Sequence, residues 1–418
     1  MVPAVAVTTS FDNAAQVLLP PESGLRYLRA NRATELTLDP GGITVGDDGR
    51  IAALEPTAGA ALSVDATGCA LLPGLVDCHT HLPFAGWRAQ EYEQKVTGVP
   101  YEEISRQGGG IASSARALRE TPDDDVLAQA TQLATEILST GTTTFECKSG
   151  YGLSREGELR SLKLAAALDA HVKQTTTRTG LLAHAVPNGY TADTWMDEVE
   201  AMLPEAAEYA DTLDIFVESI AFGLEHLDRM GALATTYKLR LRAHVEQFST
   251  MRSVPIALKH NARSLDHLSA IHPDDIGPLA QSETAAVLLP GAEFMGAEQT
   301  APARDLIEAG AIVTLATDAN PGTSPIFSLP LIVGLAVRRY GLSTKEALLA
   351  VTLNAAYVLN LDNDLGSIEP GKKADLVLLD SPAEHMAYRL GHNPVIATFV
   401  AGEPVYVRPD AQWRIASR

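Results

Sequence analysis

Short apolar runs alternate with longer amphipathic stretches from residue 71 to about residue 361. Apolar runs rich in β-branched residues are typical of buried strands, and apolar residues at every third or fourth position are typical of helices. Helices are expected at 123–140, 155–171 and 300–309, among other segments. Eight strands are expected, at 71–81, 141–148, 177–184, 213–220, 239–245, 262–267, 284–289 and 312–318.

Eight strand–helix alternations predict an α/β fold of the (β/α)8, or TIM barrel, type, which typically needs about 250 residues. An open doubly wound sheet would give the same alternation. No G-x-G-x-x-G motif follows the first expected strand, however, and such a motif is typical of dinucleotide-binding sheets. We therefore expect the barrel, over residues 71–365.

The two ends of the chain have a different pattern. Residues 1–70 and 366–418 carry short strand-like runs at 34–38, 43–45, 50–54, 374–379 and 398–407, broken by Gly and Pro. Neither end is long enough to bury a core by itself. The two ends are therefore expected to combine into one small β-sandwich module beside the barrel. The first 35 or so residues predict nothing specific.

Five of the eleven histidines fall at the ends of expected strands. In the segment Asp77-Cys78-His79-Thr80-His81, alternate side chains share one face, so His79 and His81 point the same way. Barrel enzymes carry their active sites at the C-terminal ends of the strands, which is where these histidines lie. Further strands end in a histidine or an aspartate, namely His184, His244, His267 and Asp318.

The residue types at these strand ends predict a metal site. His79, His81, His244 and Asp318 together offer three neutral nitrogens and one anionic oxygen, a set that suits one Zn²⁺ or Fe²⁺ per chain. A metal bound there would lower the pKa of a bound water to about 7, so hydrolysis is the expected chemistry.

Composition narrows the possible partners. The chain is 46% hydrophobic and 20% charged, as in ordinary globular enzymes, and its formal net charge is −20. That charge opposes binding to nucleic acid and to anionic membranes, so neither partner is expected, and an anionic substrate would need a local basic residue. Cys69, Cys78 and Cys147 show no paired-thiol spacing, which favours a reducing cytoplasm. No signal peptide or membrane span is expected.

Motifs along the chain resemble the amidohydrolase superfamily and, within it, the imidazolonepropionase family. The superfamily resemblance lies in P-G-L-V-D-C-H-T-H at 73–81, T-D at 317–318 and G-S-I-E-P-G-K-K-A-D-L-V-L-L-D at 366–380. K-S-G-Y-G-L and T-D-A-N-P-G are the most specific motifs of the narrower family. The full set is F-A-G-W-R at 84–88, Q-G-G-G-I at 107–111, K-S-G-Y-G-L at 148–153, A-H-A-V-P at 183–187, A-H-V-E-Q at 243–247, D-H-L at 266–268 and T-D-A-N-P-G-T at 317–323.

The resemblance implies a substrate, 4-imidazolone-5-propanoate, that is opened to N-formimidoyl-L-glutamate in histidine catabolism. The planar guanidinium of an arginine is well suited to bind the substrate carboxylate through two hydrogen bonds. Arg88 lies seven residues after His81 and is the expected partner. Tyr151, between two glycines, could add a hydroxyl. By similarity, the pocket is completed by His184, Gln247, Asn320, Gly322 and Thr323. The resemblance also suggests a homodimer.

The same resemblance suggests roles for two residues in catalysis. His267 is expected to stabilise the oxyanion that forms when water attacks the ring carbonyl. Asp318 is expected to take a proton from that water and to help return it to the departing ring nitrogen.

Three alternatives remain. A deaminase acting on a small heterocycle would carry H-x-x-E at the fifth strand, but here Gln247 occupies the Glu position and Glu246 should face away. A binuclear dihydropyrimidinase-like enzyme would need a lysine at the fourth strand, whereas Lys148 ends the second. A catalytically inactive scaffold would have lost metal ligands, and every expected ligand type is present.

Overall fold

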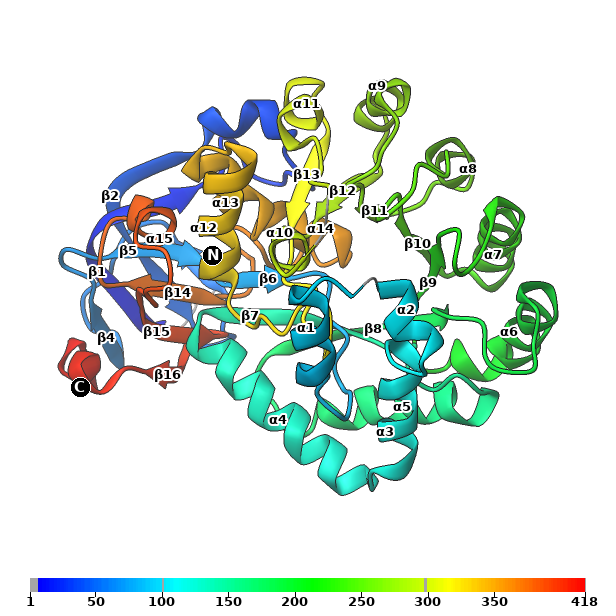
Figure 1. Cartoon of the computed structure of the whole chain (residues 1–418). Helices are drawn as coiled ribbons and strands as arrows, with labels where there is room; N and C mark the ends of the chain where they lie inside the picture. Colours follow the sequence, from blue (N-terminus) through cyan, green and yellow to red (C-terminus); the bar gives the residue numbers. More distant parts are fainter. Residues whose placement is uncertain (1–6, 100, 297–298, 418) are drawn as a thin grey trace.

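A computed structural model describes residues 7–99, 101–296 and 299–417 of the chain. Its centre is a parallel eight-stranded sheet in the order β13-β12-β11-β10-β9-β8-β7-β6 (Figure 1). Consecutive strands along the chain are neighbours in the sheet, as in a (β/α)8 barrel. The barrel strands are β6 (Leu75–Asp77), β7 (Thr142–Lys148), β8 (Thr175–Ala183), β9 (Thr212–Val217), β10 (Arg240–Val245), β11 (Ser264–His267), β12 (Ala285–Leu288) and β13 (Ile312–Leu315).

Contacts between the first and last strands bring the barrel close to closure. A parallel bridge joins Thr80 to Ala319, and the amide of His81 donates to the carbonyl of Ala319 at 2.9 Å. The buried Asp77 carboxylate accepts hydrogen bonds from the Thr317 amide at 3.1 Å and hydroxyl at 2.6 Å. The segments that follow β6 and β13 are thereby held together, so His81 and Asp318 become neighbours. The expected barrel is confirmed.

Helices follow the barrel strands and cover the barrel from outside (Figure 1). The expected helices at 123–140, 155–171 and 300–309 correspond to α4, α5 and α11, although α11 begins three residues late. Before α4, the long connection after β6 holds three shorter helices, α1 to α3. The helices are α1 (Ala89–Val96), α2 (Tyr101–Arg106), α3 (Ile111–Glu120), α4 (Asp123–Ser139), α5 (Arg155–Leu168), α6 (Ala192–Ala206), α7 (Leu224–Tyr237), α8 (Val254–Lys259), α9 (Pro273–Gln281), α10 (Pro290–Phe294), α11 (Ala303–Glu308), α12 (Leu329–Tyr340), α13 (Thr344–Ala350), α14 (Leu353–Val358) and α15 (Glu384–Tyr388).

Both chain ends join in a second sheet beside the barrel, where the blue and red segments of Figure 1 lie together. Its main path is β16-β15-β14-β5-β1-β2-β3, and β4 pairs with both β1 and β17. Phe11, Ile43, Val64 and Phe399 belong to its own buried core. The strands are β1 (Val7–Leu19), β2 (Thr37–Gly46), β3 (Ile51–Ala53), β4 (Leu62–Asp65), β5 (Ala70–Pro73), β14 (Leu376–Leu379), β15 (Val395–Val400), β16 (Glu403–Val407) and β17 (Ile415–Ser417), and the two 3-10 helices are η1 (Ala30–Glu35) and η2 (Pro409–Arg414).

The expected strands at 213–220 and 312–318 end three residues early, at Val217 and Leu315, and three other expected strands differ further from the structure. The run at 71–81 is divided at Gly74 into β5 of the end sheet and β6 of the barrel. A Cβ at Gly74 would lie 2.1 Å from the Thr143 hydroxyl oxygen, so the close passage past β7 requires glycine there. The run at 34–38 was wrong in its first part, because η1 occupies Ala30–Glu35.

The third difference is the run at 398–407, which forms two strands, β15 and β16, rather than one. They pair as an antiparallel hairpin whose turn lies at Ala401 and Gly402, both with positive φ. Two positive φ values in succession are the backbone of a tight hairpin turn. No helix in the described ranges is long and apolar enough to cross a membrane.

Candidate active site

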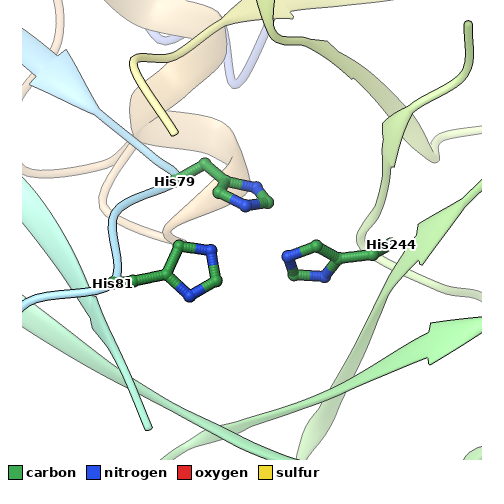
Figure 2. Close-up of side chains that lie close together, drawn as sticks. All are labelled: His79, His81 and His244. Atoms are coloured by element: carbon green, nitrogen blue, oxygen red, sulfur yellow. The ribbon is translucent and has the colours of Figure 1, made fainter. Parts of the chain in front are cut away.

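Three histidines from opposite sides of the barrel point toward one another (Figure 2). His79 and His81 lie just after β6, and His244 lies on β10. Each offers a ring nitrogen within 4.8 Å of those of the other two, and all three are buried. The alternation expected for His79 and His81 therefore brings both side chains to the same centre as His244.

Carboxylates behind two of these rings fix the direction of their nitrogens. His79 Nδ1 lies 2.6 Å from Asp266 Oδ2, and His244 Nδ1 lies 3.0 Å from Asp214 Oδ1. Because a carboxylate accepts, each Nδ1 carries the proton and each Nε2 keeps its lone pair. Both Nε2 atoms are buried without a hydrogen-bond partner among the described residues.

Burial keeps His79 and His81 uncharged. It lowers the pKa of His79 and of His81 well below the ordinary value, and the positive charge of Lys148 adds to the effect. Neutral imidazole is the form that binds a metal ion. The uncharged rings and their inward lone pairs thus suit a cation.

Asp318 supplies an oxygen at the same centre. Its Oδ1 lies 3.2 Å from His81 Nε2 and 3.5 Å from His79 Nε2. Burial raises the pKa of this carboxyl. With φ of 53°, Asp318 has a backbone conformation that costs energy, and φ of His267 is 80°. The four expected donors therefore converge, and the unpartnered Nε2 atoms of His79 and His244, the His81 ring and the Asp318 carboxyl fit one divalent cation.

A pocket lies over these donors and contains most of the expected substrate-binding side chains. His267 lines it beside the metal-type donors, with its ring centroid 5.5 Å from that of His244. Burial lowers the pKa of His267 to about 3, so the ring is neutral. The lining residues are His81, Arg88, Ile111, Tyr151, His184, Phe216, His244, Gln247, Phe248, His267, Asp318, Asn320 and Thr323.

Arg88 is the buried cation of this pocket. Its Nε and Nη1 atoms have no hydrogen-bond partner among the described residues, and the Glu91 carboxylate is 3.8 Å from Nε. The guanidinium lies against Gly322, where a Cβ would be only 1.8 Å from Nη2. Gly322 therefore stands behind Arg88 rather than on the pocket wall, and its lack of a side chain makes room for the fork. A buried cation with open donors is suited to an anion.

Two anchored loops carry the other expected residues. The buried Glu158 carboxylate accepts from the amides of Gly150, Gly152 and Leu153, at 2.8 to 2.9 Å, and so fixes the turn that carries Tyr151. His184 Nδ1 lies 2.9 Å from the carbonyl oxygen of Gly150.

Asn320 organises the second loop. Its side-chain oxygen accepts from the Gly322 and Thr323 amides at 2.9 and 2.7 Å, and its amide group donates to the Asp318 carbonyl. Asn320 lines the pocket, but its hydrogen bonds shape the loop that holds Asp318.

The residues that separated the alternatives lie as expected. Gln247 lines the pocket, whereas the Glu246 carboxylate accepts from the amides of Met251 and Ser253 and faces away. The Lys148 ammonium is paired with the Asp214 and Glu146 carboxylates at 2.6 and 3.0 Å. Neither the proton-transferring Glu of a deaminase nor a lysine free to bridge two metals is present among the described residues of this site.

Sequence reasoning missed the layer beneath the histidines. Asp214, Asp266, Arg242 and Glu146 are buried on β9, β11, β10 and β7. A signal did exist, because charged residues inside otherwise apolar barrel strands need a partner within the barrel. Their pairing depends on strand register, which the sequence does not reveal.

Comparison with known proteins places these features in a family. The model of the amidohydrolase family matches residues 70–405. A protein of Rubrobacter xylanophilus named imidazolonepropionase is 46% identical over 363 residues, which cover 86% of this chain and 87% of its own. A protein of the same name from Sphingopyxis alaskensis is 39% identical and covers 88% of this chain and 95% of its own.

Solved structures show the same fold at low sequence identity. An adenosine deaminase from Xanthomonas campestris, crystallised with bound zinc, superposes with a TM-score of 0.72 at 19% identity. The match covers 97% of this chain and 94% of that one. At this identity the likeness concerns the fold alone.

Proposed function

Because the chain belongs to the amidohydrolase family and, within it, to the imidazolonepropionases, we propose that it hydrolyses 4-imidazolone-5-propanoate to N-formimidoyl-L-glutamate, a step of histidine catabolism. The observation that carries this proposal is the pairing, in one pocket, of a metal-type donor set with an open buried guanidinium. The first suits cleavage of a ring amide, and the second suits the carboxylate of the substrate. A deaminase target is not favoured, because Gln247 cannot titrate.

His79, His81, His244 and Asp318 would hold the ion in this proposal. When bound, a divalent ion supplies Lewis acidity, which makes water more acidic and the ring carbonyl more electrophilic. Arg88 binds the substrate carboxylate through a charge-assisted pair of hydrogen bonds and so fixes the ring over the donors. Tyr151, His184, Gln247 and Thr323 surround the ring.

Protein groups handle the charge and protons of the ring opening. Water adds its oxygen to the ring carbonyl carbon, and Asp318 accepts the proton that this water releases. Neutral His267 donates an N–H to the oxyanion. The carbon–nitrogen bond then breaks, the proton passes from Asp318 to the departing nitrogen, and the former carbonyl becomes the new carboxylate.

Finer properties form part of the same proposal. One ion per chain, zinc or iron, agrees with three nitrogens and one carboxylate. A cytoplasmic location agrees with three buried cysteines that form no disulfide. The homodimer suggested by family resemblance can be checked by the mass of the protein in solution.

Product identification tests the proposed reaction. Urocanase can generate imidazolonepropionate in place, and loss of its ultraviolet absorbance is followed with and without the protein. We expect accelerated loss with formation of N-formimidoyl-L-glutamate. Unchanged loss in the presence of metal-loaded protein would exclude this substrate and direct attention to another cyclic amide.

The Arg88→Lys substitution is expected to raise KM by about 10- to 100-fold and to change kcat less, because one ammonium cannot replace a planar two-point contact with a carboxylate. Steady-state kinetics at several substrate concentrations measure this. An unchanged KM would show that Arg88 does not hold the substrate.

A second variant tests whether the position of the Arg88 guanidinium matters in addition to its charge. Gly322→Ala keeps Arg88 but places a methyl group where the guanidinium lies. We expect a KM increase in the same direction as for Arg88→Lys, with metal content unchanged. A normal KM would mean that the fork has room to move without loss of binding.

A further inference from the structure

Beneath the three histidines, buried charged groups form a continuous chain from His79 to His244. His79 contacts Asp266, which contacts Arg242, which contacts Glu146. Glu146 in turn contacts Lys148, which contacts Asp214, which contacts His244. Since His79 and His244 also face one another at the donor centre, the chain closes into a ring, which we call the charge ring.

Arg242 organises the half of the charge ring next to His79. Its Nη2 donates to Asp266 Oδ2 at 2.5 Å, and its Nη1 donates both to Glu146 Oε1 at 2.6 Å and to the Cys78 carbonyl at 2.8 Å. The guanidinium therefore touches the backbone beside His79 as well as the carboxylate behind the His79 ring. A planar guanidinium with these contacts restricts the movement of both the Cys78 backbone and the Asp266 carboxylate.

Lys148 organises the half next to His244. Its ammonium donates to Asp214 Oδ2 at 2.6 Å, which leaves Asp214 Oδ1 for the His244 ring. Asp214 thus remains an acceptor, and the Nε2 of His244 is kept free to point at the centre.

Glu146 is the only member of the charge ring that contacts both cations. Its Oε1 accepts from Arg242 and from the Thr179 hydroxyl, and its Oε2 lies 3.0 Å from Lys148. The ring buries two cations and three carboxylates, all with at most 1% of the side chain exposed. A buried network of this kind is often no more stable than an apolar core of the same volume, so stability alone does not account for it.

We propose that Glu146 is a positioning residue that couples the two halves of the metal-type site: by holding Arg242 and Lys148, it fixes Asp266 and Asp214 and thereby orients His79 and His244 together. The inference rests on the proposed function, since it requires that these histidines bind a metal ion. Partners of metal-ligating histidines commonly change metal affinity by 10- to 100-fold when they are altered. Glu146 does not contact the histidines or the carboxylates behind them, but through Arg242 and Lys148 it acts on both histidines at once.

The test is the affinity for Zn²⁺ of protein from which metal has been removed, measured by competition with a chelator. Glu146→Gln keeps the shape of the side chain and removes its charge. We expect its Kd for Zn²⁺ to be about 10- to 100-fold higher than that of the unaltered protein. The matched control is Asp375→Asn, since Asp375 is also a buried carboxylate paired with a lysine, Lys373, outside the barrel. It should leave the Kd unchanged even if it lowers the melting temperature.

A milder variant serves if Glu146→Gln does not fold. Thr179→Val removes one hydrogen bond to Glu146 and no charge, and should raise the Kd by about 2- to 10-fold. An unchanged Kd in folded Glu146→Gln or, failing that, in Thr179→Val would overturn the positioning role. Unaltered protein that binds no Zn²⁺ would instead overturn the proposed function together with this inference, so the two failures can be told apart.

Discussion

Replacing His267 with alanine is expected to lower kcat by about 10²- to 10³-fold and to leave the metal content unchanged. His267 lies at the end of β11 with its ring near that of His244, but it is not one of the three histidines that converge. Because burial keeps the ring neutral, it contributes one directed N–H rather than a charge. Its loss removes a contact to the oxyanion, which exists only while the ring is being opened.

The measurement is kcat together with metal analysis of the same sample. His226→Ala is a suitable control, because His226 is similarly buried but lies on α7, where it bonds to Gly223 and Asp193. The control should retain normal turnover. If folded His267→Ala turned over at a near-normal rate, the oxyanion role of His267 would be wrong.

Replacing Asp318 with asparagine is expected to have a larger effect, a loss of about 10³- to 10⁴-fold in kcat. The amide has the same shape, but it can neither accept the proton of the attacking water nor return it to the ring nitrogen. It is also a weaker metal donor than a carboxylate, so the affinity for Zn²⁺ should fall at the same time. This double effect distinguishes Asp318 from His267, whose loss should affect turnover alone.

Kinetics at saturating Zn²⁺ separate the two effects of Asp318→Asn. Once every molecule holds metal, the remaining loss of kcat reports the proton transfer alone. Asp362→Asn provides the control, since Asp362 is a buried carboxylate paired with Arg26, away from the donors. Restoration of normal kcat by metal alone would contradict a proton-transfer role for Asp318.

The barrel could be predicted because the chain contains eight short apolar runs, one for each strand, separated by helical segments. The predicted 239–245 and 141–148 agree with β10 and β7 within one residue at each end. Prediction failed where a single residue divides an apolar run, as Gly74 does between β5 and β6. The pattern of apolar residues along a strand does not reveal which side chain the backbone must pass closely, and here that side chain is Thr143.

The sequence predicted the residues that could bind the metal ion, but not the buried charged residues that contact them. His79, His81 and His244 stand out because barrel strands present their final residues to a shared centre, whatever lies between them in sequence. The charge ring depends instead on which residues face one another across strands. Register pairs Arg242 with Ser264 and His244 with Asp266, and only the structure supplies that register.

The same limit explains Gly322. Family resemblance marks this glycine as part of the pocket, but its reason is the Arg88 side chain that lies against it from a segment more than 200 residues earlier. Contacts of this range follow from closure of the barrel between β6 and β13, which a motif does not encode.

The dependence of hydrolysis on a bound ion is tested by removing metal from the protein with a chelator and returning it in measured steps while the hydrolysis of imidazolonepropionate is followed. We predict negligible turnover without metal, and a linear recovery that ends at one Zn²⁺ or Fe²⁺ per chain. Full turnover in protein shown by metal analysis to be free of metal would mean that this hydrolysis does not depend on an ion held by His79, His81, His244 and Asp318.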